Sequence, residues 1–422
     1  AYTQSAYDMK VSDSMYGEAS RYVCEERLLT MLGTEYETLK YRLPNKYKEA
    51  RFFAFCNTVE SLNYHKTNQG QGWVGIRFQM HLGGPVNDII LHIRMHDNSH
   101  KAQQEALGIL GVNLIYTSFF YEEGIDSFLD SLVHRLPRDR MEIDMLSVSG
   151  PDFENVDNRM LALNLVRRGI TDATLFDLAK NVLQPSTALY KKNILLMRGR
   201  FRPVTNVHID MIEKGRLEFL KEKSVKAENV ELILEFTLKD LTADGKISDK
   251  DFVDRVDLLS SLGYTVMISN YLKHYKMLEY LSTIGKGNLM GLILGVYNLQ
   301  AIFDERYYDN LPGGLFEAFG RGFGHKVKLF LYPAINVDDG SLYDIDTIRI
   351  PDNLRGLLKY MIDNDKIAPI LEYDKNYLHI MSDDVLSKIK SGGTSWEEDV
   401  PYQVVKAIKF FELFGYENKV IG

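Results

Sequence analysis

Three arginines stand at alternate positions directly after an apolar segment near the middle of the chain. Ile194–Met197 is apolar, and Arg198, Arg200 and Arg202 follow it. Alternate residues of an extended chain point to the same side, so the three guanidinium groups can meet one ligand. Such groups bind phosphate and carboxylate through paired hydrogen bonds. The spacing predicts an anion site, and the alternative is a structural network of ion pairs with acidic loops.

A helix start follows the arginines at once. Pro203 ends the extended segment, and Thr205 or Asn206 can cap a helix that begins at Val207. The first turn of a helix presents free backbone N–H groups that attract phosphate. His208 lies in that turn, where it can contact the same ligand or be an ordinary surface residue. In a parallel α/β fold this loop lies at the carboxyl end of a strand, where ligands bind.

Polar residues at the ends of other expected strands extend this site. Alternation along Val230–Leu238 places Glu235 opposite an apolar face, where a partly desolvated carboxylate can act as general acid or base. Pairing with an arginine would instead make Glu235 structural, and both interpretations stay open. The catalytic candidates are Glu235, His208 and Asn270. The substrate-binding candidates are Arg198, Arg200, Arg202, Thr205, Lys328 and Tyr332.

A hairpin earlier in the chain offers a second anion candidate. Trp73–Leu82 and Asp88–His96 each alternate between apolar and polar residues, so each strand has one face of each kind. If Leu82 pairs with Ile89 across the turn, Arg77 lies opposite Arg94. Two directly opposed arginines repel each other and favour an anion between them. The alternative is a solvated face with both side chains extended into water.

Two patterns resemble metal sites. Asp240–Asp251 is similar to a calcium loop, but Asp251 stands where the loop requires glutamate, and a turn that caps the next helix is the expected structure. His92 and His96 could bind a metal ion, but Arg94 between them would repel it. We therefore expect no metal site, and the sequence identifies no cofactor.

Strand-like and helix-like segments alternate from Val112 onward at roughly 30-residue spacing, which is typical of β-α units. The expected strands are 113–119, 141–148, 173–177, 193–198, 230–238, 264–269, 288–295 and 326–333. About eight units predict an α/β fold resembling a (β/α)₈ barrel, with an open doubly wound parallel sheet as the alternative. The predicted regions are 1–111 (helix and antiparallel hairpin), 112–342 (β-α core) and 343–422 (α-rich extension).

Composition limits the classes of protein that remain. Hydrophobic residues make up 45% and the net charge is −8, so we expect a soluble globular protein that binds no nucleic acid. No apolar segment approaches the roughly 20 residues of a membrane helix. Cys24 and Cys56 lie in apolar segments, and two free thiols indicate a reducing compartment. We expect a cytoplasmic location, or an organelle matrix after removal of a targeting segment.

Several segments together resemble a bacterial family. They are GWVGIRFQM, QQEALGILGVNLIY, YKKNILLMRGRFRPVTNV, ERYYDNLPGGLFEAFGR and LFLYP. Automated labels call that family either "TonB-dependent receptor" or "nicotinate-nucleotide adenylyltransferase". The sequence lacks the many alternating strands of roughly 10 residues that a large outer-membrane barrel requires, which disfavours the receptor label.

The adenylyltransferase label implies a strand followed by G-x-F-x-P-x-[H/T]-x-G-H at the start of a helix. Gly199, Phe201, Pro203, Thr205 and His208 match this spacing. The glycine before the histidine is replaced by valine, the motif lies in mid-chain, and no second signature is evident. The resemblance therefore implies nucleotide transfer as one hypothesis among others.

Three hypotheses about function follow. The first is a small-molecule metabolic enzyme acting on an anionic, phosphorylated substrate held by the arginine-rich loop, and a second is a nucleotidyltransferase. The third is a non-catalytic binding or self-assembling protein. Homo-oligomer formation would use the apolar residues of the C-terminal helix, which are Val404, Val405, Ile408, Phe411 and Phe414. We expect a small anionic ligand as partner, and neither nucleic acid nor a membrane.

Overall fold

The computed structural model divides into two compact units, residues 1–174 and 175–422. It describes residues 9–43, 49–120, 124–243, 246–285, 288–324 and 326–417. The predicted boundary after residue 111 falls inside helix α3 (His100–Phe119), and the one after residue 342 falls inside strand β15 (Leu342–Tyr343). Within the described residues, no helix is long and apolar enough to cross a membrane.

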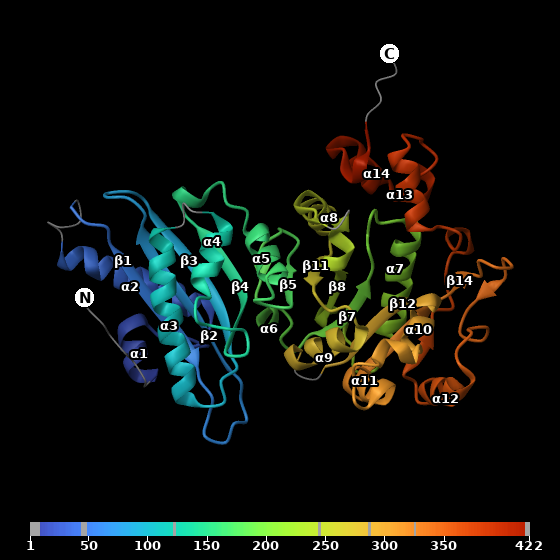
Figure 1. Ribbon diagram of the computed structural model, residues 1–422, viewed down its shortest axis with the longest axis horizontal. Coiled ribbons are helices and arrows are strands. Elements are labelled where there is room, and N and C mark those ends of the chain that lie inside the picture. Colours follow the sequence, from blue (N-terminus) through green and yellow to red (C-terminus); the bar gives the residue numbers. More distant parts are fainter. Residues whose placement is uncertain are drawn as a thin grey trace, which may run out of the picture. The chain divides into compact units, whose positions relative to one another are not determined.

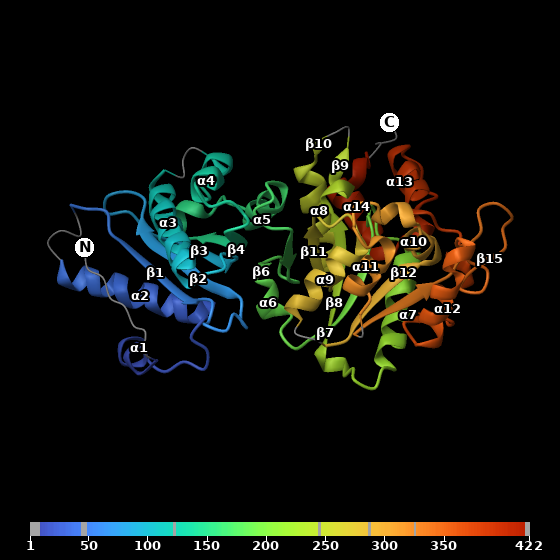
Figure 2. The same cartoon turned by 60° about the horizontal axis from the view of Figure 1, so that its bottom comes forward.

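The first unit is built on a four-stranded antiparallel sheet in the order β1-β2-β3-β4. Its elements are α1 (Met9–Tyr16), α2 (Glu25–Arg42), β1 (Phe53–Glu60), β2 (Gly70–Gln79), β3 (Val86–Met95), α3, α4 (Ile125–Leu132), β4 (Met141–Ser149) and α5 (Asn158–Arg167). Gly75 lies against Leu28 of α2, whereas its neighbour Val74 packs in one core with Leu110 of α3. Figure 2 shows α2 and α3 on opposite sides of this sheet.

Helix α3 corrects the expected strand at 113–119. Ser99 caps the helix by accepting a hydrogen bond from the Ala102 N–H, and buried Ala106, Leu110 and Leu114 recur at helical spacing. The seven residues 113–119 taken alone are apolar enough to fit a strand. The whole segment is 20 residues long, which is typical of a helix and too long for a strand.

The hairpin register differs from the predicted one. Gln79 pairs with Val86, and Arg77 therefore lies opposite Asp88. The Arg77 guanidinium donates to both carboxylate oxygens of Asp88, at 2.8 and 2.7 Å. The prediction that Arg77 faces Arg94 is wrong, because this register satisfies the arginine with a carboxylate on the neighbouring strand.

The second unit contains an eight-stranded sheet in the order β16-β13-β12-β7-β8-β11-β5-β6. Its strands are β5 (Ala173–Phe176), β6 (Val182–Leu183), β7 (Asn193–Arg198), β8 (Val230–Thr237), β11 (Thr265–Ser269), β12 (Met290–Gly295), β13 (Val327–Tyr332) and β16 (Ile367–Pro369). The order begins at β16 and ends at β6, so the described strands form an open sheet rather than a closed barrel. Figure 1 allows the elements to be followed along the chain.

Six strands of this sheet have the order of a doubly wound fold. Neighbours from β16 to β11 pair in parallel. When β7, β8, β11, β12, β13 and β16 are counted from one to six, their spatial order is 6-5-4-1-2-3, a common order of doubly wound sheets. The open sheet that sequence analysis held as its alternative therefore describes this unit, with β5 and β6 added at one edge.

Helices cover both faces of the parallel strands. They include α7 (Asn206–Leu220), α8 (Asp249–Ser261), α9 (His274–Ile284), α10 (Val296–Ile302), α11 (Gly314–Gly322) and α12 (Arg355–Asp363). Phe219 of α7 lies against Gly291 and Leu195 on one face, whereas Ile194 points to the other face and lies against Gly285 at the end of α9. Phe252 of α8 contacts Phe236 on the face that α7 covers.

The C-terminal helices α13 (Ser382–Lys390) and α14 (Tyr402–Phe411) belong to the second unit. In α14 the apolar residues Val404, Val405 and Ile408 are buried, whereas Phe411 is 62% exposed. Most of the apolar face that suggested self-assembly is therefore covered. Cys24 and Cys56 are free thiols, and Cys56 is buried.

Candidate functional site

The loop between β7 and α7 occupies the point at which the strand order reverses. β7 ends at Arg198 and α7 begins at Asn206. Strand β8 lies on one side of β7 and β12 lies on the other, so the next strands along the chain continue on opposite sides. In open α/β sheets the crevice for a ligand forms at the carboxyl ends of the strands at this position. We call residues 199–205 the β7–α7 loop.

A left-handed residue and a cis peptide shape the β7–α7 loop. Phe201 has a φ of 48° and a fully buried side chain, and the Arg202–Pro203 peptide is cis. The Gly199 N–H donates to the Glu235 carbonyl oxygen at 3.0 Å. The Arg200 carbonyl accepts a hydrogen bond of 2.8 Å from Arg255 on α8. The loop is thus held from inside the unit at two successive residues.

Three successive backbone N–H groups of this loop have no acceptor in the described part of the chain. They belong to Arg200, Phe201 and Arg202. Phe201, in the left-handed region, is the central residue of the three. Successive N–H groups around such a residue form a concave anion-binding nest. The free N–H groups of the first turn of α7 follow a few residues later, so the main chain itself offers donors to a phosphate group.

His208 completes the start of α7. Its Nδ1 accepts a hydrogen bond from the Thr205 N–H at 3.1 Å. Burial lowers the pKa of His208 to about 4, so its ring is neutral at physiological pH. A neutral ring that accepts at Nδ1 carries its proton on Nε2, which is then a donor. Thr205 and His208 therefore lie together at the helix start, as their spacing predicted.

Arg198 is engaged by Glu235 on the neighbouring strand. Its Nε and Nη2 lie 2.5 and 2.9 Å from the two oxygens of Glu235, which is fully buried. Ser269 donates to the same carboxylate at 2.5 Å. This arrangement matches the structural alternative for Glu235, because both carboxylate oxygens already have donors.

The two arginines of the β7–α7 loop, Arg200 and Arg202, also have acidic neighbours. Arg200 is 63% exposed and lies 2.8 Å from Asp383 at the start of α13. Arg202 lies 3.6 Å from Asp251. Exposed pairs such as Arg200–Asp383 are weak and can exchange partners. Arg200 is therefore the loop arginine most able to turn toward a ligand.

The remaining predicted site residues lie at both the amino and the carboxyl ends of the strands. Lys328 lies at the amino end of β13, away from the β7–α7 loop, and pairs with Glu222 at 2.6 Å and Asp365 at 2.7 Å. The structure therefore does not bring Lys328 together with the candidates of the β7–α7 loop. Tyr332 lies at the carboxyl end of β13 and donates to Asp210 of α7 at 2.5 Å. Asn270 is exposed immediately after β11.

Sequence analysis missed two residues near the loop. One is His274, the first residue of α9. Burial, and to a lesser extent the nearby positive charge of Arg198, lower the pKa of His274 to about 3. Arg255 is fully buried on α8. It stands three residues after Phe252 and one before Val256, among the buried apolar positions of the helix. An arginine on an apolar helix face is unusual, and this pattern is visible in the sequence.

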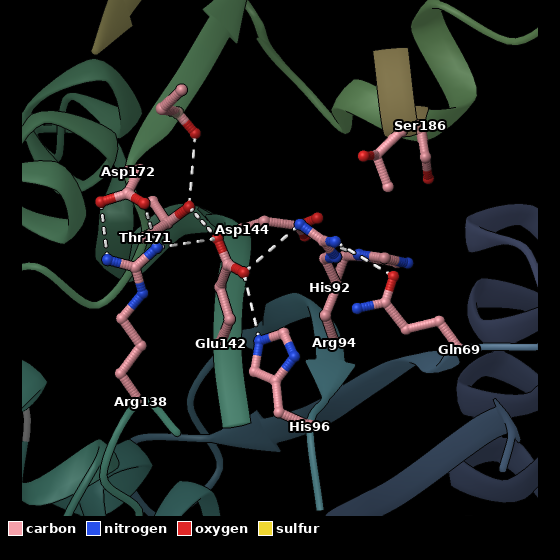
Figure 3. A network of polar contacts seen from close by, with 12 residues as sticks. Gln69, His92, Arg94, His96, Arg138, Glu142, Asp144, Thr171, Asp172 and Ser186 are labelled. Atoms are coloured by element: carbon pink, nitrogen blue, oxygen red, sulfur yellow. Dashed lines mark hydrogen bonds and ion pairs between the residues drawn. The ribbon is translucent and has the colours of Figure 1, made fainter. Parts of the chain in front are cut away.

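Two arginines of the first unit, Arg94 and Arg138, lie beside a carboxylate of the protein. Figure 3 shows Glu142 at the centre of this polar network. Its carboxylate has four neighbours, which are Thr171 at 2.6 Å, Arg94 at 3.4 Å, His96 at 3.4 Å and Arg138 at 3.9 Å. Burial alone would raise the pKa of Glu142, but the hydrogen bond from His96 and the other neighbours lower it to about 2. Arg94 is thus balanced internally, and Arg77 and Arg94 are not opposed to each other as the predicted anion site required.

The calcium-like segment forms a helix cap. Ser248 accepts a hydrogen bond from the Asp251 N–H at 3.2 Å, and Asp251 itself pairs with Arg255. Asp244 and Gly245 of this segment lie outside the described residues. In the described part of the chain, no group of three potential metal-ligating side chains occurs.

Comparison with known proteins does not assign the chain to a family. No protein-family model matches the chain, and none of the curated proteins matches it. The resemblance to adenylyltransferases therefore stays a prediction based on the residues of the β7–α7 loop.

Proposed function

We propose that the second unit binds the phosphate chain of a nucleoside triphosphate at the β7–α7 loop and transfers the nucleotidyl group to a phosphorylated acceptor. The observation that supports this most directly is the set of unpaired N–H groups of residues 200–202, beside the start of α7 at the reversal of strand order. The Gly199, Phe201, Pro203, Thr205 and His208 pattern supports it independently.

In this reaction an oxygen of the acceptor phosphate attacks the α-phosphorus. The bond from that phosphorus to the oxygen bridging to the β-phosphate breaks, and pyrophosphate leaves with the bonding electrons. The protein has to hold phosphate oxygens and stabilise the charge on the leaving group. Backbone N–H groups of the loop and Nε2 of His208 can donate to those oxygens, and Arg200 can exchange Asp383 for them.

This assignment revises the roles expected from the side chains. Arg198 and Glu235 stabilise the sheet beneath the loop rather than the ligand, because each satisfies the other. Phosphate binding then depends mainly on the main chain, with His208 and Arg200 as side-chain donors. The substrate remains anionic and phosphorylated, as the first hypothesis expected.

Calorimetric titration of the full chain with ATP and with inorganic tripolyphosphate tests the proposal. We expect both to bind, and we expect pyrophosphate release when ATP is mixed with a mononucleotide acceptor such as nicotinate mononucleotide. Replacing His208 by alanine should weaken tripolyphosphate binding about tenfold, the cost of one hydrogen bond to a charged group.

His134→Ala provides the matched control, because His134 is an exposed histidine of the first unit. We expect this variant to bind both ligands as the unmodified protein does. Absence of binding by the unmodified protein would overturn the proposed phosphate site. Binding without pyrophosphate release across a panel of phosphate monoesters would leave a nucleotide-binding protein and overturn the transfer reaction.

A further inference from the structure

Arg255 is a buried cation in the interior of the second unit. It lies on α8, is 0% exposed, and its guanidinium carbon is 5.5 Å from the centre of the Phe236 ring. Burying a guanidinium group is costly unless charge and hydrogen bonds compensate it. Asp251, one turn earlier on the same helix, provides the compensation with two hydrogen bonds of 3.0 and 2.6 Å. The charge of Arg255 is therefore balanced within α8.

The other donors of Arg255 reach out of α8 to two backbone carbonyl groups. Nη2 donates to the Asp240 carbonyl oxygen at 2.8 Å, and Nη1 donates to the Arg200 carbonyl oxygen at 2.8 Å. Asp240 belongs to the turn after β8, and Arg200 belongs to the β7–α7 loop. One guanidinium group thus joins the connections that follow two adjacent strands.

The hydrogen bond to Arg200 sets the direction of a neighbouring N–H group. In a trans peptide the carbonyl oxygen and the following N–H point in opposite directions. Because Arg255 draws the Arg200 carbonyl toward the interior, the Phe201 N–H is directed away from α8. That N–H is the middle member of the three unpaired donors of the β7–α7 loop.

We propose that Arg255 is a positioning residue for phosphate binding, which it supports by holding the Arg200–Phe201 peptide in the orientation that aims the nest of N–H groups at the ligand. This inference rests on the proposed function. Arg255 itself does not touch the ligand, and it acts through the main chain of the loop.

Stability and positioning can be separated by removing the ion pair as a whole. Replacing Arg255 alone leaves the buried Asp251 without its counter-charge, and the resulting loss of stability would obscure any effect on binding. Replacing both residues with apolar side chains of similar volume is often neutral for stability. In Arg255→Met with Asp251→Leu, the buried charges are both gone, but the Arg200 carbonyl has lost its donor.

The experiment measures the dissociation constant of inorganic tripolyphosphate by calorimetry, together with the thermal midpoint, for the full chain and its variants. We expect the double variant to keep its thermal midpoint within a few degrees and to bind tripolyphosphate about tenfold more weakly, as expected for donors displaced by a fraction of an ångström. The substitution of Asp251 also removes the acidic neighbour of Arg202. This side effect would strengthen anion binding, so it cannot account for the weaker binding that we expect.

Two comparisons complete the test. Arg321→Met with Glu279→Met removes another bidentate ion pair of the second unit, a partly exposed one that joins α9 and α11, and this control should leave the dissociation constant unchanged. Arg255→Lys keeps the charge but not the paired geometry, and its affinity should lie between those of the unmodified protein and the double variant. A double variant of Arg255 and Asp251 that binds tripolyphosphate as tightly as the unmodified protein would overturn the positioning role. Failure of the unmodified protein to bind would instead overturn the proposed function.

Discussion

Each unit of this protein contains a group of arginines, and the two groups differ in what remains unpaired around them. In the first unit, Arg94 and Arg138 surround the buried carboxylate of Glu142. In the second, Arg198 is similarly engaged by Glu235, but the backbone N–H groups of residues 200–202 are left without acceptors in the described structure. The number of arginines is therefore not what separates the two regions, and the proposed phosphate site rests on the unpaired backbone donors of residues 200–202.

The strongest test of this comparison removes Glu235. Replacing it by leucine leaves the largely buried Arg198 without a counter-charge, and we expect a loss of about 4 kcal/mol in the free energy of unfolding of the second unit. Chemical denaturation in a Trp73→Phe background measures this, since Trp396 then reports on the second unit alone.

The double variant Arg198→Met with Glu235→Leu should recover most of that stability and keep tripolyphosphate binding. If its affinity falls by more than about tenfold, Arg198 or Glu235 contacts the ligand, and the comparison between the two arginine groups fails.

The corresponding change in the first unit has a somewhat smaller expected effect. Glu142→Gln removes the carboxylate that pairs with Arg94, whereas Arg138 keeps its two contacts with Asp172, so part of the charge balance survives. We expect a loss of about 3 kcal/mol, measured with Trp73 in a Trp396→Phe background. Tripolyphosphate affinity should not change, and a change would show that the network in Figure 3 affects the phosphate site.

The pH dependence of the first unit should report the same carboxylate. The pKa of Glu142 falls from 4.5 to about 2 on folding. A lowered carboxyl pKa stabilises the folded state fully above pH 4.5, and this stabilisation is lost as the pH falls from 4.5 to about 2. The Glu142→Gln variant should lack this component of the acid transition, and an identical acid transition in both proteins would assign it to other groups.

The smallest expected effect concerns the exposed pair at the β7–α7 loop. Asp383→Asn removes a competitor for Arg200 and should tighten tripolyphosphate binding about twofold, as befits a surface ion pair. Calorimetry at low ionic strength would measure this change, and Asp384→Asn, the neighbouring carboxylate on α13, serves as the control. Weaker binding of the Asp383→Asn variant would mean that Asp383 helps to orient Arg200 for the ligand.

Local patterns predicted the elements around the site with close agreement. Strand β7 has the predicted bounds Asn193–Arg198, and α7 begins within one residue of the predicted start. Both follow from short-range rules, because an apolar run, a proline and a capping threonine act over a few residues. The hairpin register depended on which strand residues meet across the sheet, and it was not predicted correctly. The helix at His100–Phe119 was also missed, although its cap at Ser99 and its apolar spacing are local signals.

The sequence by itself determined an α/β protein with a strand, a loop and a capped helix at residues 193–220, and it singled out Thr205 and His208 at the helix start. Only the tertiary structure decided that the sheet is open, that β7 lies where its strand order reverses, and that the loop arginines meet Glu235, Asp251 and Asp383. The reason is physical. Capping and strand formation are local, whereas the partner of a long charged side chain depends on segments that are distant in the chain and come together only when the sheet assembles.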